Sequence, residues 1–542
     1  MTLEWLVGIP LVAAIINLLL REQREEWARW ISLVALSIDL ILAASLWLTG
    51  MAETGGSGPW IAQSERAWIP QLGVSFRLGM DGLSLVMVLL TLFLGLASII
   101  CSWTEITDRV AFFHFNLMAV LTGILGVFLA LDLFLFAFFW ELMLVPMYLV
   151  IGLWGHENRR YAAFKFFIFT QAGGLLLLAG IVTLYFAHAA ETGTYTFNYF
   201  DLLGTSMSEQ AATLVMLCFF LAFAVKLPIV PLHTWLPDAH TEAPTAGSVI
   251  LAGLLLKTGA YGLIRFVVPL FPSAAAQFAG IANTLAVIGI LYGAVLAFAQ
   301  TDFKRLVAYT SISHLGFVLL GVFAGTELAL QGAVMQMICH GISTGALFML
   351  VGMLQERTGT RDMDRLGGLW AAVPRMSGIA LVFALASLGL PGLGNFVGEF
   401  TVLLGTYQTY PYMAVPAATG LVFAAIYALW IMRRVFFGPL TIESRIPDVS
   451  VRESAVMAAL VAAIVWLGVY PQPVFNLTVR SVEAVVRRAS GEGHELSTPF
   501  LNYSDVPKHV KAAIGNAPNV GAPLAAPSGR ASPAPTMPSD RQ

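Results

Sequence analysis

The chain has 542 residues, of which 58% are hydrophobic and only 11% are charged, and its mean hydropathy is +0.79. Soluble domains usually carry about a quarter charged residues, so water is not the solvent for most of this chain. The formal net charge of -3 is nearly neutral for this length, and the sequence contains no long basic run, which argues against nucleic acid as a partner.

Apolar stretches long enough to cross a lipid bilayer recur along almost the whole chain. A spanning helix needs roughly 20 mostly apolar residues, and we count fourteen such stretches. The expected spans are residues 3–20, 29–50, 81–103, 110–130, 133–154, 160–187, 209–231, 244–269, 276–299, 302–323, 327–354, 376–404, 410–437 and 452–473. The predicted fold class is therefore an all-α polytopic membrane protein.

Lysine and arginine gather in the odd-numbered connections between these spans. The members of this set are Arg21, Arg24, Arg29, Arg109, Arg159, Arg160, Lys304, Arg305, Arg357, Arg361, Arg365, Arg375, Arg445 and Arg452. Of the even-numbered connections only the long second one, with Arg66 and Arg77, contains any. Because cytoplasmic loops are enriched in lysine and arginine, this alternation supports the count of fourteen and predicts that both termini face the periplasm.

Equal spacings between polar residues suggest an internal repeat. The step from Glu141 to His314 equals the step from Lys226 to Glu399, as if two blocks of five helices carried matching sites. An odd number of helices in each block would invert the second copy. Aligning Pro228 with Pro391 instead gives a different spacing between the two blocks. The two alignments disagree, so coincidence is the alternative explanation of the equal spacings.

The expected organisation has five parts. They are residues 1–105 with helices 1–3, residues 106–270 with helices 4–8, residues 271–440 with helices 9–13, residues 441–490 with helix 14 and a following segment, and residues 491–542. The last part is rich in proline, alanine, glycine and serine. Such a composition buries too little apolar surface to fold, so we predict a disordered tail.

Seven ionisable residues lie deep inside the expected spans. They are Glu141, Lys165, Lys226, Lys257, His314, His340 and Glu399. A charge at the centre of a spanning helix costs roughly 2.5 to 3.5 kcal/mol, so these side chains are expected to face the bundle, water or one another. Buried ion pairs that only orient helices are the alternative interpretation for any single residue, but this becomes a weaker explanation for all seven together.

Two of these residues suggest a charge-controlled switch. Glu141 lies midway along the apolar stretch FFWELMLVPMYLVIGLWG, and Lys226 lies in AFAVKLPIVPLHTWLPDAH. Pro228 and Pro231 lack amide donors and clash with earlier carbonyls, so we expect the helix to break beside the lysine. A nearby carboxylate favours the charged ammonium group, so moving or neutralising Glu141 is expected to release the Lys226 proton.

The other residues suit a proton relay. Lys257 lies on a helix whose small residues permit close packing and a file of water. His314 and His340 are candidate proton carriers, because histidine can titrate near neutral pH. Glu399 follows Pro391 and several glycines that are expected to unwind its helix. Two broken helices that each carry an ionisable group resemble the discontinuous helices at transporter sites.

Other polar patterns do not indicate a metal or cofactor site. The seven-residue separation of His233 and His240 across a proline-containing turn is not a recognised metal spacing, so we interpret this segment as loop structure. The stretch GLGNFVG lacks the strand and helix of a dinucleotide-binding turn. The three cysteines stand apart in apolar stretches, without a CxxC pair for zinc, a cluster or a redox disulfide. We predict no metal site.

Four stretches resemble the proton-translocating antiporter-like subunits of respiratory complex I, the NADH-quinone oxidoreductase. They are FFWELMLVPMYLVIGLWG, AFAVKLPIVPLHTWLPDAHTEAPTAGSVILAGLLLKTGAYGLIRF, DFKRLVAYTSISHLGFVLLG and LPGLGNFVGEF. The resemblance extends from about residue 75 to about residue 440. Within this superfamily, a glutamate at position 399, where the sibling subunits have a lysine, points to the subunit M or chain-4 type. The tail beyond residue 490 departs from the usual pattern.

This resemblance implies fourteen helices with two inverted five-helix repeats and two discontinuous helices. It implies that Glu141 and Lys226 form the input pair, that Lys257, His314 and His340 form the central relay, and that Glu399 releases protons to the periplasm. NADH, FMN, iron-sulfur clusters and quinone would belong to partner subunits, and this chain would bind no cofactor. Its partners would be other membrane-arm subunits, especially the L-type and N-type antiporter-like subunits, in the bacterial inner (cytoplasmic) membrane.

Two other functions remain open from the sequence. A Na⁺/H⁺ antiporter subunit of a multi-subunit cation exchanger would share the broken helices and the lysines, although Glu399 argues against it. A spacer that only holds other subunits apart would need no titratable groups. Variants that assemble normally but lose proton pumping would exclude the spacer.

Overall fold

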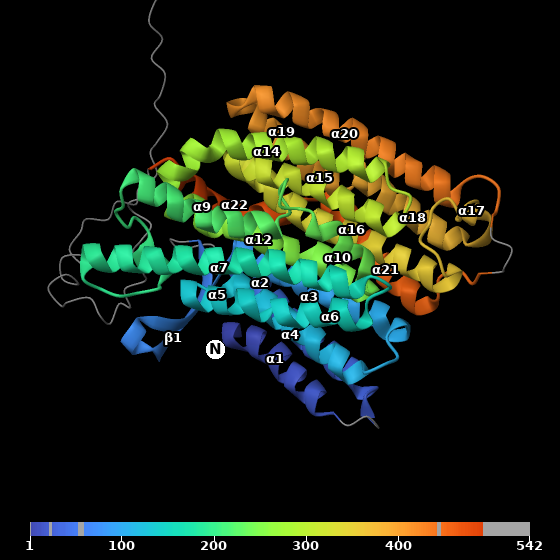
Figure 1. Cartoon of the computed structure of the whole chain (residues 1–542), viewed down its shortest axis with the longest axis horizontal. Helices are drawn as coiled ribbons and strands as arrows, with labels where there is room; N and C mark the ends of the chain where they lie inside the picture. Colours follow the sequence, from blue (N-terminus) through green and yellow to red (C-terminus); the bar gives the residue numbers. More distant parts are fainter. Residues whose placement is uncertain (1, 21–23, 53–58, 442–445, 492–542) are drawn as a thin grey trace, which may run out of the picture. The chain divides into compact units, whose positions relative to one another are not determined.

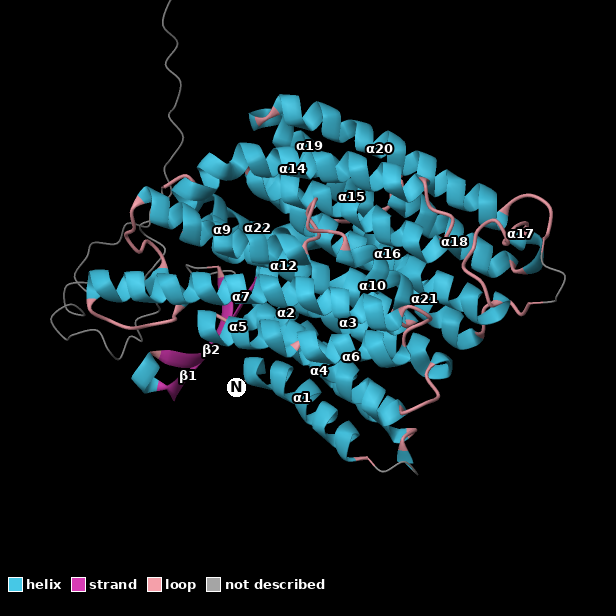
Figure 2. Ribbon diagram, viewed as in Figure 1, coloured by secondary structure: helices cyan, strands magenta, loops and turns pink. Residues whose placement is uncertain are grey.

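Long apolar helices make up most of this computed structural model, which describes residues 2–20, 24–52, 59–441 and 446–491 (Figure 2). Within these ranges, thirteen helices are long and apolar enough to cross a membrane. A further apolar span is divided between α18 (Pro374–Ser387) and α19 (Gly394–Thr409). Each predicted span corresponds to one of these segments, so the all-α polytopic fold is confirmed.

The spans differ in continuity. Unbroken helices are α1 (Thr2–Leu19), α2 (Trp27–Ala52), α3 (Gly82–Glu105), α4 (Val110–Leu129), α7 (Arg159–Thr192), α14 (Pro272–Phe298), α15 (Phe303–Phe323), α16 (Glu327–Thr358) and α21 (Val451–Val469). Composite or interrupted spans are α5 (Leu133–Leu142) with α6 (Leu144–Trp154), α9 (Glu209–Lys226) with α10 (Trp235–Glu242), α18 with α19, and α20 (Pro411–Ile431) with the π-helical η5 (Met432–Phe436). Shorter elements in the connections are η2 (Pro70–Leu72), α8 (Tyr199–Leu202) and α17 (Leu369–Ala372), and α22 (Gln472–Ala489) follows the last span.

Two spans are interrupted where helix breaks were expected. After α9 the chain passes Pro228 and Pro231 before it becomes helical again in α10. Between α18 and α19 it turns at Gly389 and Gly392, whose φ angles of 78° and 96° are left-handed. Missing amide donors explain the first break, and the conformational freedom of glycine permits the second. Both predicted discontinuous helices are confirmed.

Further irregularities occur in two other spans. The helix that carries Glu141 is broken at Met143, three residues before Pro146, because the proline has no amide to donate to the carbonyl of Leu142. The eighth span consists of α11 (Thr245–Ile250), η3 (Leu251–Leu255), α12 (Leu256–Gly262), η4 (Leu263–Val267) and α13 (Val268–Leu270), in which η3 and η4 are π-helical. These wider turns often occur at functional sites.

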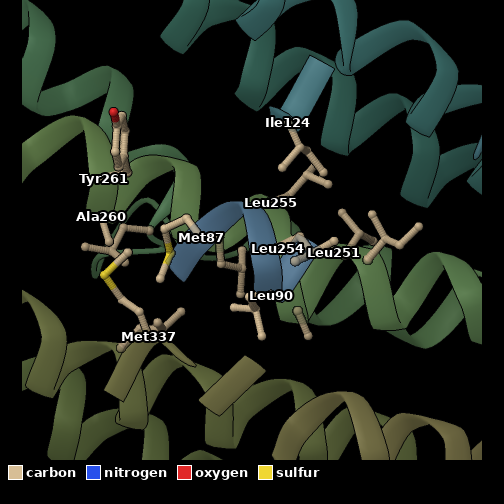
Figure 3. Packing of buried hydrophobic residues seen from close by; sticks show 14 of the residues in the cluster. Met87, Leu90, Ile124, Leu251, Leu254, Leu255, Ala260, Tyr261 and Met337 are labelled. Carbon is tan, nitrogen blue, oxygen red and sulfur yellow. The ribbon is translucent and has the colours of Figure 1, made fainter. Parts of the chain in front are cut away.

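The eighth span lies at the centre of the apolar core, and every residue of Thr245–Leu270 is buried. Figure 3 shows Leu90 of α3 beside Leu254 of η3 and Met87 of α3 on the side of Ala260, with Ile124 of α4 and Met337 of α16 on opposite sides. Because protein surrounds this helix, its polar groups are removed from lipid.

Connections rich in arginine meet at one end of the helices, which we name the arginine-rich end. Three contacts join residues that lie in these connections or at the adjoining helix ends and are distant in sequence. Arg29 donates to the carbonyl of Ile106 at 2.9 Å. Arg361 pairs with Asp302 at 3.1 Å, and Arg452 donates to the hydroxyl of Thr104 at 2.9 Å. This clustering agrees with the predicted alternation of charged connections, while the membrane side of each end stays a prediction.

A β-hairpin and an amphipathic helix occupy the opposite end. The strands β1 (Trp60–Ile69) and β2 (Val74–Asp81) pair antiparallel within the second connection, near the N-terminus in Figure 1. Helix α22 buries Val474, Thr478, Ser481, Val482 and Val485, which share one face. Neither element was predicted, because β1 has no clean alternation of apolar residues and α22 is too polar for a spanning helix.

Gly82 at the start of α3 allows α22 to approach closely. A Cβ atom added at Gly82 would lie 1.8 Å from the carbonyl oxygen of Leu477. We therefore expect Gly82→Ala to displace α22 and to lower the midpoint of thermal unfolding of the assembled complex. Gly378→Ala in α18 is the control, because nothing lies within 4 Å of the added atom. Equal unfolding midpoints for the two variants would contradict this packing argument.

Two features predicted from the sequence stay predictions. The tail predicted to be disordered lies outside the described residues apart from residue 491. The five-part organisation and the inverted repeat both stay predictions.

Candidate functional site

Lys257 and His340 form a buried pair between the eighth span and α16. The Lys257 Nζ atom lies 2.6 Å from His340 Nδ1 and 2.5 Å from the carbonyl oxygen of Ala252. Both side chains are completely buried. Ala252 is five residues before Lys257 within the π-helical region, so the wider helical turn helps to present its carbonyl to the ammonium group. A proton between Nζ and Nδ1 has a short path in either direction.

His340 lies next to His314 of α15. Their ring centroids are 5.7 Å apart and their planes are inclined by 63°. His340 Nε2 has no hydrogen-bond partner among the described residues. One water molecule can bridge two rings at this separation. The two predicted histidines are therefore neighbours, although they are not directly hydrogen-bonded.

His314 is held between Glu399 and Tyr427. Its Nδ1 atom lies 2.6 Å from Glu399 Oε1, and its Nε2 atom lies 2.9 Å from the Tyr427 hydroxyl. Gln336 donates to the same Glu399 oxygen at 2.7 Å. All four side chains are buried. The two contacts of His314 fix the orientation of its imidazole ring. His314 and Gln336 are the two hydrogen-bond donors to the Glu399 carboxylate.

The second oxygen of Glu399 faces the break between α18 and α19. Oε2 has no hydrogen-bond partner in the described part of the chain. A Cβ atom added at Gly389, in this break, would lie 3.5 Å from it. Lys257, His340, His314 and Glu399 thus form a continuous buried line, which we name the central line, and it ends at an interrupted helix.

Lys226 is buried but is not directly paired. Its Nζ atom has no hydrogen-bond partner among the residues described, and it lies 5.3 Å from the ring centre of Trp140 and 5.6 Å from that of Phe166. Aromatic faces stabilise a cation in such positions. A Cβ atom added at Gly259, two residues after Lys257, would lie 3.0 Å from the Lys226 Cβ atom, so the lysine borders the eighth span.

Glu141 is half-buried and lies against α7. A Cβ atom added at Gly174 would be 1.9 Å from its carboxylate, so a larger residue there would displace the carboxylate. Gln171 of the same helix lies near this carboxylate, and Lys226 interacts with it electrostatically. No described carboxylate approaches Lys226 within 4.0 Å, so the structure brings Glu141 and Lys226 close without a direct ion pair.

Lys165 lies apart from the central line. Its Nζ atom pairs with Asp238 of α10 at 2.7 Å, and Arg305 contacts the other oxygen of Asp238 at 3.4 Å. Lys165 therefore belongs to an ion-pair network near the arginine-rich end.

Two residues of the site, Gln336 and Tyr427, are absent from the predicted set. Both are neutral, and neutral polar residues in apolar helices are too common to serve as a signal. A further correction concerns His240, which we interpreted as loop structure. It lies in helix α10, whereas His233 lies in the turn before that helix. Within the described residues, no group of three or more His, Cys, Asp or Glu side chains is arranged to hold a metal ion.

Comparisons with known proteins agree on one family. The family model for the transmembrane region of NADH:quinone oxidoreductases and Mrp antiporters matches residues 130–424. NADH-quinone oxidoreductase subunit M of Pseudomonas aeruginosa is 52% identical over 495 residues, covering 90% of this chain and 97% of the relative. Subunit M of Escherichia coli is 51% identical over 487 residues, covering 88% of this chain and 96% of the relative.

A solved structure supports the same assignment. A chain of respiratory complex I from Thermus thermophilus with bound NADH superimposes with a TM-score of 0.82 and is 33% identical, covering 90% of this chain and all of that chain. The chain is more than half identical to two subunits M over nearly their full lengths. This identity shows which subunit family the chain belongs to. The chain therefore belongs to the subunit M family of NADH-quinone oxidoreductase, an antiporter-like subunit of the complex I membrane arm in the proton-translocation family.

Proposed function

We propose that this chain conducts protons from the cytoplasm to the periplasm along the central line, driven by NADH:quinone electron transfer in partner subunits. The observation that carries the proposal is the unbroken contact sequence Lys257, His340, His314 and Glu399, which joins a π-helical span to a discontinuous helix. Burial excludes bulk water from these groups, so a proton that enters the line passes between them in order.

Glu141 and Lys226 provide the input. With Glu141 ionised nearby, the buried Lys226 ammonium group is stabilised by the carboxylate and by two aromatic faces. When electron transfer in a partner subunit moves or neutralises that carboxylate, the ammonium group keeps only the aromatic contacts. Lys226 then gives up its proton toward the neighbouring eighth span.

The central line passes this proton on. Lys257 as an ammonium group donates to His340 Nδ1. The proton then shifts to the imidazole, and His340 releases a proton from its Nε2 atom on the other side of the ring. This exchange of the two ring nitrogens is what allows a histidine to serve as a carrier.

His314 acts as the gate before Glu399. Both of its ring nitrogens are engaged, one by Glu399 and one by Tyr427. To receive a proton from His340, His314 exchanges its Tyr427 bond for a water bridge toward His340. Its Nδ1 proton then moves to Glu399, which releases it beside the break between α18 and α19.

The partners follow from the family. The chain is a subunit of an oxidoreductase complex, and we assign NADH, FMN, iron-sulfur and quinone sites to its partner subunits. The L-type and N-type antiporter-like subunits would be its neighbours in the bacterial inner membrane. The arginine-rich end would face the cytoplasm, which places both termini in the periplasm.

The cation-exchanger alternative is not favoured. Relatives that share about half of their residues with this chain are subunits M of NADH-quinone oxidoreductase. The residue that first argued against an exchanger, Glu399, is hydrogen-bonded within the central line.

Replacement of the input residues tests the proposal. In Glu141→Gln and Lys226→Ala complexes reconstituted into vesicles, we expect fewer protons pumped per NADH oxidised, because the charge that controls release is absent. The measurement is quenching of a pH-sensitive dye, normalised to NADH oxidation. Lys165→Ala is the matched control, because this lysine pairs with Asp238 outside the line. Normal assembly and an unaltered proton ratio in both input variants would refute the mechanism.

A further inference from the structure

His240 is a buried histidine whose ring lacks hydrogen bonds. Its side chain is completely buried, and neither ring nitrogen has a partner in the described ranges. The ring stacks on Phe348 of α16, with centroids 4.7 Å apart and planes inclined by 9°. Buried polar nitrogens are normally hydrogen-bonded, and leaving one without a partner costs about 1–3 kcal/mol. A purely structural stacking role would be filled better by an apolar ring.

The position of His240 is between the central line and the arginine-rich end. Phe348 lies eight residues beyond His340 on α16, which corresponds to about 12 Å along the helix axis. The charges of Lys304 and Lys257 both act on His240, and His240 and His340 also interact electrostatically.

Beyond His240 lies a pair of opposite charge, the half-buried Glu105 and the buried Lys304. Glu105 accepts hydrogen bonds from the amide and the hydroxyl of Thr245, both at 2.9 Å, through one carboxylate oxygen. Its other oxygen has no partner in the part of the chain described. Lys304 is buried, donates to the carbonyl of Ala243 and interacts electrostatically with Glu105. Lys304 thus contacts the segment that joins α10 to the eighth span, and Glu105 contacts the first residue of that span.

A surface cleft opens at the arginine-rich end, and Lys304 interacts electrostatically with His156, Asp302 and Arg361 of its lining. Its volume is about 390 Å³, and its lining includes His156, Asp302 and Arg361. The His156 amide donates to the carbonyl of Glu242 at 2.9 Å, so the cleft borders the C-terminal end of α10. Burial and the charge of Lys304 lower the pKa of His156 to about 4, so this histidine is neutral near pH 7 and holds no proton at the mouth of the cleft.

We propose that His240 carries protons from this cleft to the Lys257 and His340 pair, which makes it the uptake residue of the chain. A proton reaches Glu105 and Lys304 from the cleft and binds one free ring nitrogen of His240. The opposite nitrogen then releases a proton toward Lys257, so the histidine returns to its neutral form and no charge accumulates. The proposal rests on the proposed function: Lys226 starts each transfer by giving its proton to the eighth span, and His240 restores the proton that the line has passed on, so the line does not turn over repeatedly without it.

Two substitutions at His240 test this role in the assembled complex. His240→Phe keeps an aromatic ring against Phe348, and His240→Gln keeps polar atoms, but neither side chain carries a proton as an imidazole does. We expect both variants to assemble and to lose pumped protons per NADH oxidised to the level of Lys257→Ala. His114→Gln is the matched control, because His114 is also buried with a free ring nitrogen but lies on α4 outside the route.

Substitutions at His240, Glu105 and Lys257 also distinguish the uptake route from the relay. We expect the double variant His240→Gln with Glu105→Gln to pump no worse than His240→Gln alone, because both residues lie on one path. Retained pumping in either His240 variant, beside its loss in Lys257→Ala, overturns the uptake route and leaves the relay standing. Retained pumping in Lys257→Ala overturns the relay itself.

Discussion

Replacing Glu399 with glutamine is expected to stop proton release through this chain while the complex still assembles. Glutamine keeps an oxygen that accepts from His314 and Gln336, so the packing around it is preserved. It cannot take up the proton that His314 delivers. Because a positioned proton-transfer group typically contributes about a hundredfold or more in rate, the flux through this chain is expected to fall by about that factor.

The number of protons pumped per NADH oxidised is measured by the quenching of a pH-sensitive dye in vesicles that contain the reconstituted complex. Glu327→Gln is the control, because Glu327 is an exposed carboxylate at the start of α16. A Glu399→Gln complex that pumps the normal number of protons would show that the carboxylate is not the terminal group of the central line.

The spans and most of the titratable groups could be predicted because the membrane simplifies their sequence pattern. A run of about 20 apolar residues has few alternatives to a spanning helix. A charged residue such as Lys257 stands out within such a run, and its cost in lipid requires a partner. The same logic located both discontinuous helices, since Pro228 and Gly389 occur where a continuous helix was otherwise expected.

The pairings could not be predicted, because they depend on packing between distant segments. His314 and Glu399 are 85 residues apart, and Lys257 and His340 are 83 apart. Tyr427 shows the same limit, because its hydroxyl becomes part of the site only when α20 packs against α15. His240 was misassigned because two prolines nearby favoured a loop, whereas the chain resumes a short helix after the break.

A buried ion pair fixes the far end of the span that carries Lys257. Arg265 lies eight residues after Lys257 and donates to Asp81 at 2.6 Å. Asp81 also caps α3 by accepting from the amide of Ser84 at 2.9 Å. Both charged side chains are buried, and the guanidinium group stacks on Trp60 at 5.0 Å. The pair therefore ties the relay helix to the β-hairpin.

The charge of Asp81 is maintained despite its burial. Burial alone would raise the pKa of Asp81, but the Arg265 guanidinium group and the Ser84 amide hold that pKa below its usual range. An aspartate whose pKa is lower in the folded protein stabilises it above the unfolded pKa of about 3.9. The contribution is therefore complete at neutral pH, and it is lost only as the pH falls below about 4 toward the folded pKa.

Removing the cation alone is expected to destabilise the protein strongly. Arg265→Met leaves the Asp81 carboxylate buried without its partner, and breaking a buried pair in this way costs about 3–5 kcal/mol. The assembled complex should show a lower midpoint of thermal unfolding at pH 7. The double variant Asp81→Asn with Arg265→Met should recover much of the loss, because asparagine still caps α3 and carries no charge. If the double variant were no more stable than Arg265→Met, the cost would come from lost packing around the guanidinium group, and the ion pair would not be what holds the relay helix in place.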